Sequence, residues 1–133
     1  MRVVDASVIV KIAKEEEGTE EALKIKQEHV EGREKIIVPN LLFYEVANAL
    51  RYAPELEEED ISNFLQILDD LDFEVIALDV KDIAKAVSWA KQKNITVYDA
   101  AYLALAREFE VELITADVAL FDKVQDLGLV KKL

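Results

Sequence analysis

Four acidic residues of this chain are isolated from its other charged residues. Asp5, Glu45, Asp99 and Asp117 are each the only charged residue within an otherwise apolar or uncharged stretch. Burying an ionised carboxylate without a partner costs several kcal/mol even after relaxation. A protein without a use for these groups would avoid that cost or place a basic residue beside each of them. The pattern therefore marks these four residues as candidate functional groups.

A divalent cation would resolve the repulsion between these carboxylates if the fold brings them together. A ligand set made only of oxygen atoms suits hard ions, and we therefore expect Mg²⁺ or Mn²⁺. Such ions support phosphodiester cleavage by lowering the pKa of a bound water and stabilising the charge of the leaving oxygen. That chemistry needs no nucleophilic side chain, which fits a sequence with no Cys and only one His.

Each acid also has a structural interpretation that needs no ligand. Asp99 can act as a helix N-terminal acid, and Asp117 can be an ordinary turn residue. Glu45 is harder to explain in this way, because neither a cap nor a turn is expected there. The functional interpretation therefore depends on the four residues together.

Strands and helices alternate along the chain, and this alternation predicts a parallel sheet with helices on both faces. Since crossovers are right-handed, we expect a three-layer α/β/α sandwich with a central, mostly parallel sheet, formed by one domain over residues 1–133. Ligands of such folds bind beyond the carboxyl ends of the strands. The predicted strands are Arg2–Asp5, Ile36–Val38, Phe73–Leu78, Val111–Thr115 and Leu129–Leu133. The first predicted helix begins at Ala6. The other predicted helices cover Glu15–Glu34, Leu41–Arg51, Asp60–Leu71, Lys81–Lys93, Tyr98–Phe109 and Leu120–Leu127.

The composition limits the classes of function that remain. A formal net charge of −12 argues against binding nucleic acid through a basic surface. The sequence contains no long apolar run that could cross a membrane and no signal-peptide pattern before Asp5, so a cytoplasmic location is expected. The single histidine, His29, lies in a charged stretch, and we expect it at the surface.

Four segments of the sequence resemble the PIN-domain nucleases, and more narrowly the VapC-type toxins of prokaryotic toxin–antitoxin pairs. The segments occur in the order and at the spacing typical of that family, and the resemblance covers the whole chain. They are Val3–Ser7, Tyr44–Leu50, Tyr98–Ala106 and Leu113–Asp117.

The resemblance implies a Mg²⁺- or Mn²⁺-dependent endoribonuclease that acts on RNA. It assigns the catalytic, metal-binding positions to the four isolated acids and supporting hydrogen bonds to Ser7 and Thr115. A homodimer and inhibition by a cognate antitoxin are further implications of the family. The RNA target does not follow from it.

Further residues near the acids are candidates for supporting roles. Asn48 lies one turn after Glu45 on the same helix face and could hold its carboxylate or a substrate phosphate, or be an ordinary polar residue. Lys11 could meet a phosphate or serve only solubility. Two alternatives to the nuclease remain: a catalytically silent PIN-like module that binds a partner, and, with fewer matching positions, a phosphoacceptor receiver-type domain.

Overall fold

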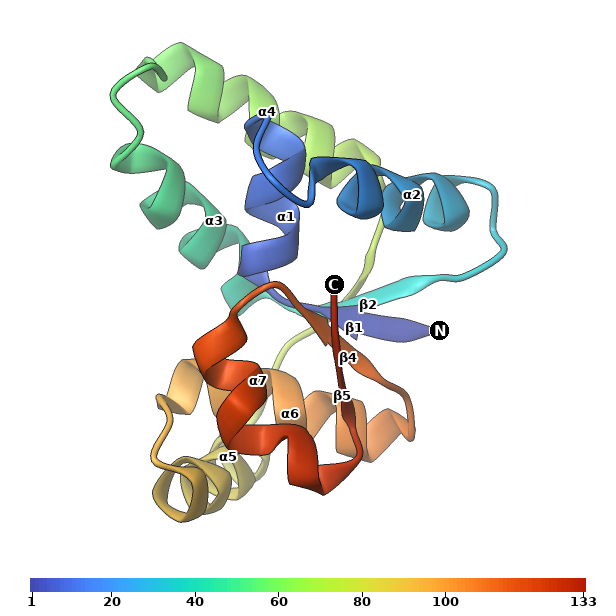
Figure 1. Ribbon diagram of the computed structural model, residues 1–133, viewed down its shortest axis with the longest axis vertical. Helices are drawn as coiled ribbons and strands as arrows, with labels where there is room; N and C mark the ends of the chain where they lie inside the picture. Colours follow the sequence, from blue (N-terminus) through green and yellow to red (C-terminus); the bar gives the residue numbers. More distant parts are fainter.

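The computed structural model describes residues 1–133, and its five strands form one sheet in which every neighbouring pair is parallel (Figure 1). The strand order is β3-β2-β1-β4-β5. In the register, Val3 of the central strand pairs with Ile37 on one side and Leu113 on the other. The strands are β1 (Arg2–Val4), β2 (Ile36–Pro39), β3 (Glu74–Ile76), β4 (Leu113–Thr115) and β5 (Val130–Lys132).

Helices cover both faces of this sheet, which confirms the predicted three-layer α/β/α sandwich. Figure 1 shows α1 to α4 on one face and α5 to α7 on the other. None of the helices combines the length and the apolar character that a membrane span requires. They are α1 (Ala6–Ala13), α2 (Thr19–Val30), α3 (Leu41–Arg51), α4 (Glu58–Asp70), α5 (Val80–Lys93), α6 (Val97–Phe109) and α7 (Val118–Val124), followed by the 3₁₀ turn η1 (Gln125–Leu127).

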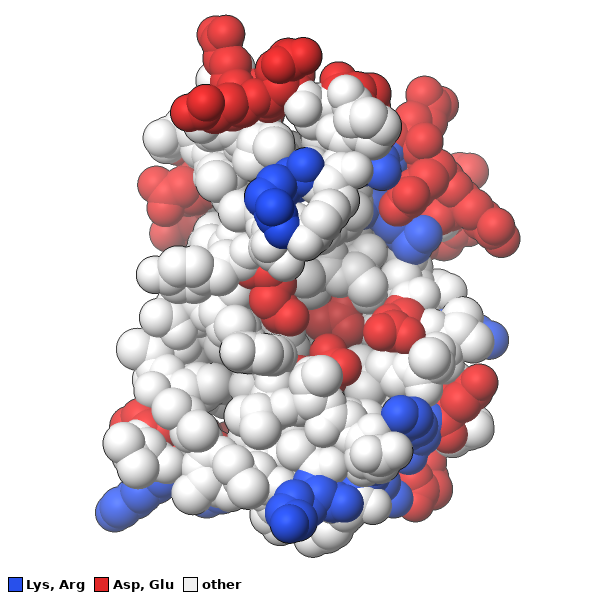
Figure 2. Space-filling model, turned by 90° about the vertical axis from the view of Figure 1, so that its left-hand side faces the viewer, with Lys and Arg blue, Asp and Glu red and all other residues white.

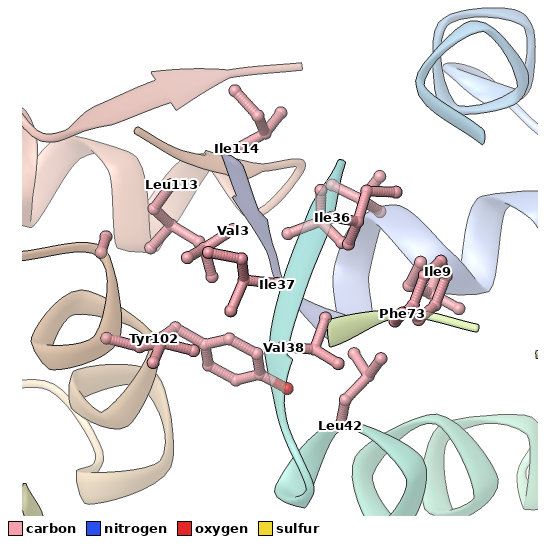
Figure 3. Packing of buried hydrophobic residues seen from close by; sticks show 14 of the residues in the cluster. Val3, Ile9, Ile36, Ile37, Val38, Leu42, Phe73, Tyr102, Leu113 and Ile114 are labelled. Carbon is pink, nitrogen blue, oxygen red and sulfur yellow. The ribbon is translucent and has the colours of Figure 1, made fainter. Parts of the chain in front are cut away.

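The hydrophobic core lies on both sides of the three central strands (Figure 3). These strands are rich in β-branched residues and buried on both faces, as expected for the middle of a parallel sheet. Helix α6 is buried from Ala100 to Ala106, which agrees with its apolar sequence. Its Tyr102 is 1% exposed, and Figure 3 shows the ring pointing toward β2 near Val38.

Helix α2 begins later than predicted. Gly18 precedes it with a φ of +91°, a left-handed backbone conformation that glycine adopts without steric cost. A Cβ at this position would lie 2.9 Å from the flexible end of the Lys11 side chain, which could shift, so the backbone conformation is the stronger reason for glycine. The charged residues before Gly18 therefore form a turn, and the helix covers only Thr19–Val30.

His29 is buried, so its predicted surface position is wrong. The side chain is 2% exposed and packs edge-on against Phe73 at 5.0 Å between ring centroids. Its Nδ1 accepts a hydrogen bond from the Ile36 backbone N–H at 3.0 Å, and Nε2 lies 2.7 Å from the Leu71 carbonyl oxygen. The surrounding charges face solvent on the other side of an amphipathic helix, which is why the local composition was misleading.

Candidate functional site

The four isolated acids belong to four elements that meet at the carboxyl edge of the sheet. Asp5 directly follows β1 and precedes α1, whereas Asp117 follows β4 and precedes α7. Glu45 lies in the second turn of α3, and Asp99 lies in the first turn of α6. Figure 2 shows acidic side chains in a hollow near the middle of one face, surrounded by uncharged surface.

Asp5 is the most buried of the four, and its carboxylate is held by three donors. It is 5% exposed. The backbone N–H of Ser7 donates to Oδ1 at 3.0 Å, so Asp5 also caps the N-terminus of α1. The Ser7 hydroxyl donates to the same oxygen, and the Thr115 hydroxyl donates to Oδ2. Both oxygens of Asp5 are thus oriented by the neighbouring chain.

The Ser7 and Thr115 hydroxyls also join the ends of β1 and β4. Ser7 Oγ accepts from the Ala116 backbone N–H at 2.8 Å, and Thr115 Oγ1 accepts from the Asp117 N–H at 3.1 Å. The two hydroxyl oxygens lie 3.3 Å apart. The structure therefore places both residues where the sequence predicted supporting partners of Asp5, in one network with the backbone of Asp117.

Burial raises the pKa of Asp5 to about 6, although the hydrogen bonds from Ser7 and Thr115 act in the opposite direction. The negative charge of Asp99 contributes to this rise. The carboxylate thus lies in a place where its charged form is disfavoured and where a positive group would be favourable. A strongly shifted group in a hollow is typical of a functional site.

Glu45 is half-buried and receives a hydrogen bond from Tyr102. The Tyr102 hydroxyl donates to Oε1 at 2.6 Å and links α6 to α3. Burial raises the pKa of Glu45, Tyr102 lowers it, and the charge of Asp99 raises it. Burial and the neighbouring Glu45 raise the pKa of the Tyr102 hydroxyl far above its ordinary value, so this group is a permanent donor.

Asp99 is the common neighbour of the other three acids. Burial raises its pKa, the Thr96 hydrogen bond lowers it, and the charge of Asp117 raises it. Asp99 in turn raises the pKa of both Asp5 and Glu45. The four carboxylates therefore act electrostatically as one group, with Asp99 at its centre.

Asp117 is exposed and has a structural function as well. Its Oδ1 accepts from the Leu120 backbone N–H at 3.0 Å and caps α7. One carboxylate oxygen of Asp117 therefore caps a helix, whereas an ordinary turn residue was the structural alternative expected from the sequence. The other oxygen has no hydrogen-bond partner among the protein groups.

The oxygen atoms of the four carboxylates are suitable ligands for a hard divalent cation, but the carboxylates do not surround one common ion position. No three acidic or histidine side chains lie close enough together to hold one ion. None of the four acids forms an ion pair with Lys or Arg. Four carboxylates without an ion-pair partner, one of them buried, suit Mg²⁺ or Mn²⁺ in their chemistry, and their side chains would have to move to close around one ion.

The contacts of Lys11 and Asn48 support a functional role less strongly than those of the four acids. Lys11 donates to the Glu17 carbonyl oxygen at 2.6 Å and lies 3.6 Å from a Glu16 carboxylate oxygen, so its charge is already compensated. Asn48 is exposed, and its amide makes no hydrogen bond to the protein. Neither is held against Glu45, although Lys11 lines a cavity of about 400 Å³ together with Ser7 and Glu45.

Sequence reasoning missed three residues at this site. Tyr102 follows Asp99 by three positions on α6, and that spacing could have indicated a contact on the same helix face. Thr96 is the N-cap of α6 and accepts from the Asp99 N–H at 3.0 Å, a spacing typical of helix starts. Lys123, on α7, contributes a positive charge that lowers the pKa of Asp99. Its sequence neighbours gave no signal of this.

Comparison with known proteins assigns the family. The PIN domain family model matches residues 2–127. The chain is 34% identical over 125 residues to ribonuclease VapC3 of Pyrobaculum aerophilum, a match that covers 91% of this chain and 92% of that protein. The chain therefore belongs to the PIN domain family and is a VapC-type member of it.

Solved structures share the fold over almost the whole chain. The crystal structure of PAE2754 from Pyrobaculum aerophilum matches with a TM-score of 0.71 and 23% identity, covering 97% of this chain and 81% of that one. VapC20 of Mycobacterium tuberculosis, a sarcin-ricin loop cleaving toxin, matches with a TM-score of 0.73 and 13% identity, covering 98% and 97%. A chain of a toxin–antitoxin complex from Klebsiella pneumoniae matches with a TM-score of 0.71 and 17% identity, covering 98% and 96%.

Proposed function

We propose that this protein is a divalent-metal-dependent endoribonuclease and the toxin of a toxin–antitoxin pair. The observation that carries the proposal is the group of four carboxylates at the carboxyl edge of the sheet, without a basic ion-pair partner and with Asp5 buried among donors. The identity to ribonuclease VapC3 supports the same activity.

The proposal gives each acid a function. Asp5 and Asp99 are the principal ligands of Mg²⁺ or Mn²⁺, and Asp117 completes the site directly or through water. Glu45 holds a second ion or orients the attacking water, with its carboxylate aimed by Tyr102. Bound metal supplies an activated water and charge stabilisation at the leaving oxygen. Ser7 and Thr115 keep the Asp5 oxygens in place.

Two kinds of protein partner belong to the proposal. An antitoxin is supported by the structural likeness to a chain of a toxin–antitoxin complex from Klebsiella pneumoniae. A homodimer is an expectation from the resemblance to VapC-type toxins, and a cytoplasmic location is the expectation from the sequence pattern. The overall charge of −12 suits a partner that carries a basic segment.

Cleavage of labelled RNA by the purified protein tests the proposal. Total RNA and short synthetic RNAs are incubated with Mg²⁺, with Mn²⁺ and with a chelator. The proposal predicts cleavage with either metal and none with the chelator. Cleavage that persists in the chelator contradicts the metal mechanism. Intact RNA under every condition, from protein shown to be folded, favours the catalytically silent module.

A further inference from the structure

A cavity of about 370 Å³ borders the acidic site on the side of α7. Asp99 and Asp117 form part of its wall, and Asn94, Thr96 and Lys123 form another part. Its size lies at the lower end of the range of small-ligand pockets, ~300–1,000 Å³. The cavity is thus continuous with two of the four acids and contains one cationic side chain.

Lys123 forms no ion pair in this cavity, although its charge acts on Asp99 and lowers the pKa of that carboxyl group. Its ammonium group donates to the Asn94 carbonyl oxygen at 2.8 Å, which links α7 to the end of α5. That oxygen is neutral, and Lys123 forms no ion pair. An ammonium group has three donors, so two remain for a ligand.

Lys11, the lysine on the other side of the acidic site, already has an acidic partner. Lys11 lines the cavity beside Ser7 and Glu45, but Glu16 and the Glu17 carbonyl oxygen already occupy it. An anion approaching there would have to displace the Glu16 contact. The two sides of the acidic site are therefore unequal, and the stronger anion position is the one beside Asp99.

We propose that the cavity formed by Asn94, Thr96, Asp99, Asp117 and Lys123 binds the nucleotide phosphate next to the one that is cleaved, with Lys123 as its cation. This inference rests on the proposed nuclease function and extends it with a binding subsite. Once metal offsets the charge of the carboxylates, Lys123 provides positive charge for a second phosphate of the same strand. The RNA strand then extends from the four acids into the cavity on the side of α7, although the overall surface is acidic.

The test compares charge-matched variants in RNA binding as a function of salt concentration. The probe is a short, fluorescently labelled single-stranded RNA pool of randomised sequence with Mg²⁺. The protein carries Glu45→Gln to prevent cleavage, which leaves the proposed principal metal ligands Asp5 and Asp99 in place. Lys123→Gln should weaken binding roughly 5-fold at low salt and lower the slope of log Kd against log salt by about 0.7 to 1. Lys123→Arg should keep the slope, since it keeps the charge.

Lys91→Gln is the matched control, because Lys91 is an exposed lysine on α5 that makes no ion pair or hydrogen bond and lies outside this cavity. It should leave the slope unchanged. Equal slopes for Lys123→Gln and Lys91→Gln would overturn the subsite, and a lowered melting temperature with an unchanged slope would show that Lys123 is only a structural tether. A changed slope together with a parent protein that cleaves no RNA would show that Lys123 contacts an RNA phosphate, but it would reject the proposed nuclease and with it a subsite next to a cleaved phosphate.

Discussion

The hydroxyl of Tyr102 donates a hydrogen bond to Oε1 of Glu45 at 2.6 Å, and this contact joins α6 to α3 beside the acidic site. Tyr102 is fixed by its burial in the core, so its hydroxyl has a defined position. Glu45 projects from a different helix and is only half-buried. The core thereby orients a carboxylate that would otherwise be free to choose among several rotamers.

Removing this hydroxyl should impair activity more than stability. Tyr102→Phe should lower RNA cleavage roughly 10-fold, because partners that orient metal-site carboxylates contribute about 10- to 100-fold. The free energy of unfolding should fall by only about 1 kcal/mol. Cleavage rates and thermal denaturation measure the two effects. Tyr98→Phe is the control, since the Tyr98 hydroxyl is exposed and makes no hydrogen bond. Equal activity in both variants would contradict the role of Tyr102.

Neutralising Asp5 should stabilise the metal-free protein. Its raised pKa of about 6 means that the folded state binds a proton more tightly than the unfolded chain does, so its contribution to stability falls as pH rises from about 4 to about 6. Asp5→Asn should therefore raise the free energy of unfolding at pH 7 by roughly 1–3 kcal/mol and leave it unchanged at about pH 4.

Denaturant unfolding with a chelator present measures this difference. Asp122→Asn is the matched control, because Asp122 is an exposed acid on α7 and its loss changes the net charge equally. The Asp122 variant should resemble the parent protein at both pH values. A loss of stability in Asp5→Asn at pH 7 would show that the buried carboxylate is compensated by groups of the protein itself.

Metal affinity should rise with pH, whereas the contribution of Asp5 to the stability of the metal-free protein falls. A ligating carboxylate must be ionised, so protons compete with the metal at Asp5 until the pH exceeds about 6. Mn²⁺ binding measured by calorimetry should strengthen about tenfold between about pH 5 and about pH 7, with release of protons to the buffer. Affinity that is the same at both pH values would exclude Asp5 as a ligand with this raised pKa.

His29 should contribute to stability and not to activity. His29→Phe keeps a ring in the core but leaves the Ile36 N–H and the Leu71 carbonyl oxygen without their partner. Unsatisfied buried groups of this kind cost about 1–3 kcal/mol each, so the variant should unfold at a clearly lower denaturant concentration. Cleavage per folded molecule should equal that of the parent protein. A selective loss of cleavage would assign His29 a function that its position does not explain.

The sequence was sufficient to predict the layers of the fold and the isolated acids, because both follow from local patterns. Alternating apolar strands and amphipathic helices specify a parallel sandwich, and its strands end where Asp5 and Asp117 follow. The chain could not reveal Tyr102 as the partner of Glu45, since that contact joins residues 57 positions apart. The burial of His29 was missed for the same reason, because it depends on Leu71 and Phe73.

The most direct test of the four-acid metal site is Mn²⁺ binding and RNA cleavage by Asp99→Asn, compared with Asp122→Asn. Asp99 raises the pKa of Asp5 and Glu45, and Asp117 raises that of Asp99, so Asp99 is coupled to all three other acids. The metal-site account predicts a folded Asp99 variant that neither binds Mn²⁺ with the parent's affinity nor cleaves RNA, whereas the Asp122 variant does both. Full metal-dependent cleavage by Asp99→Asn would contradict it.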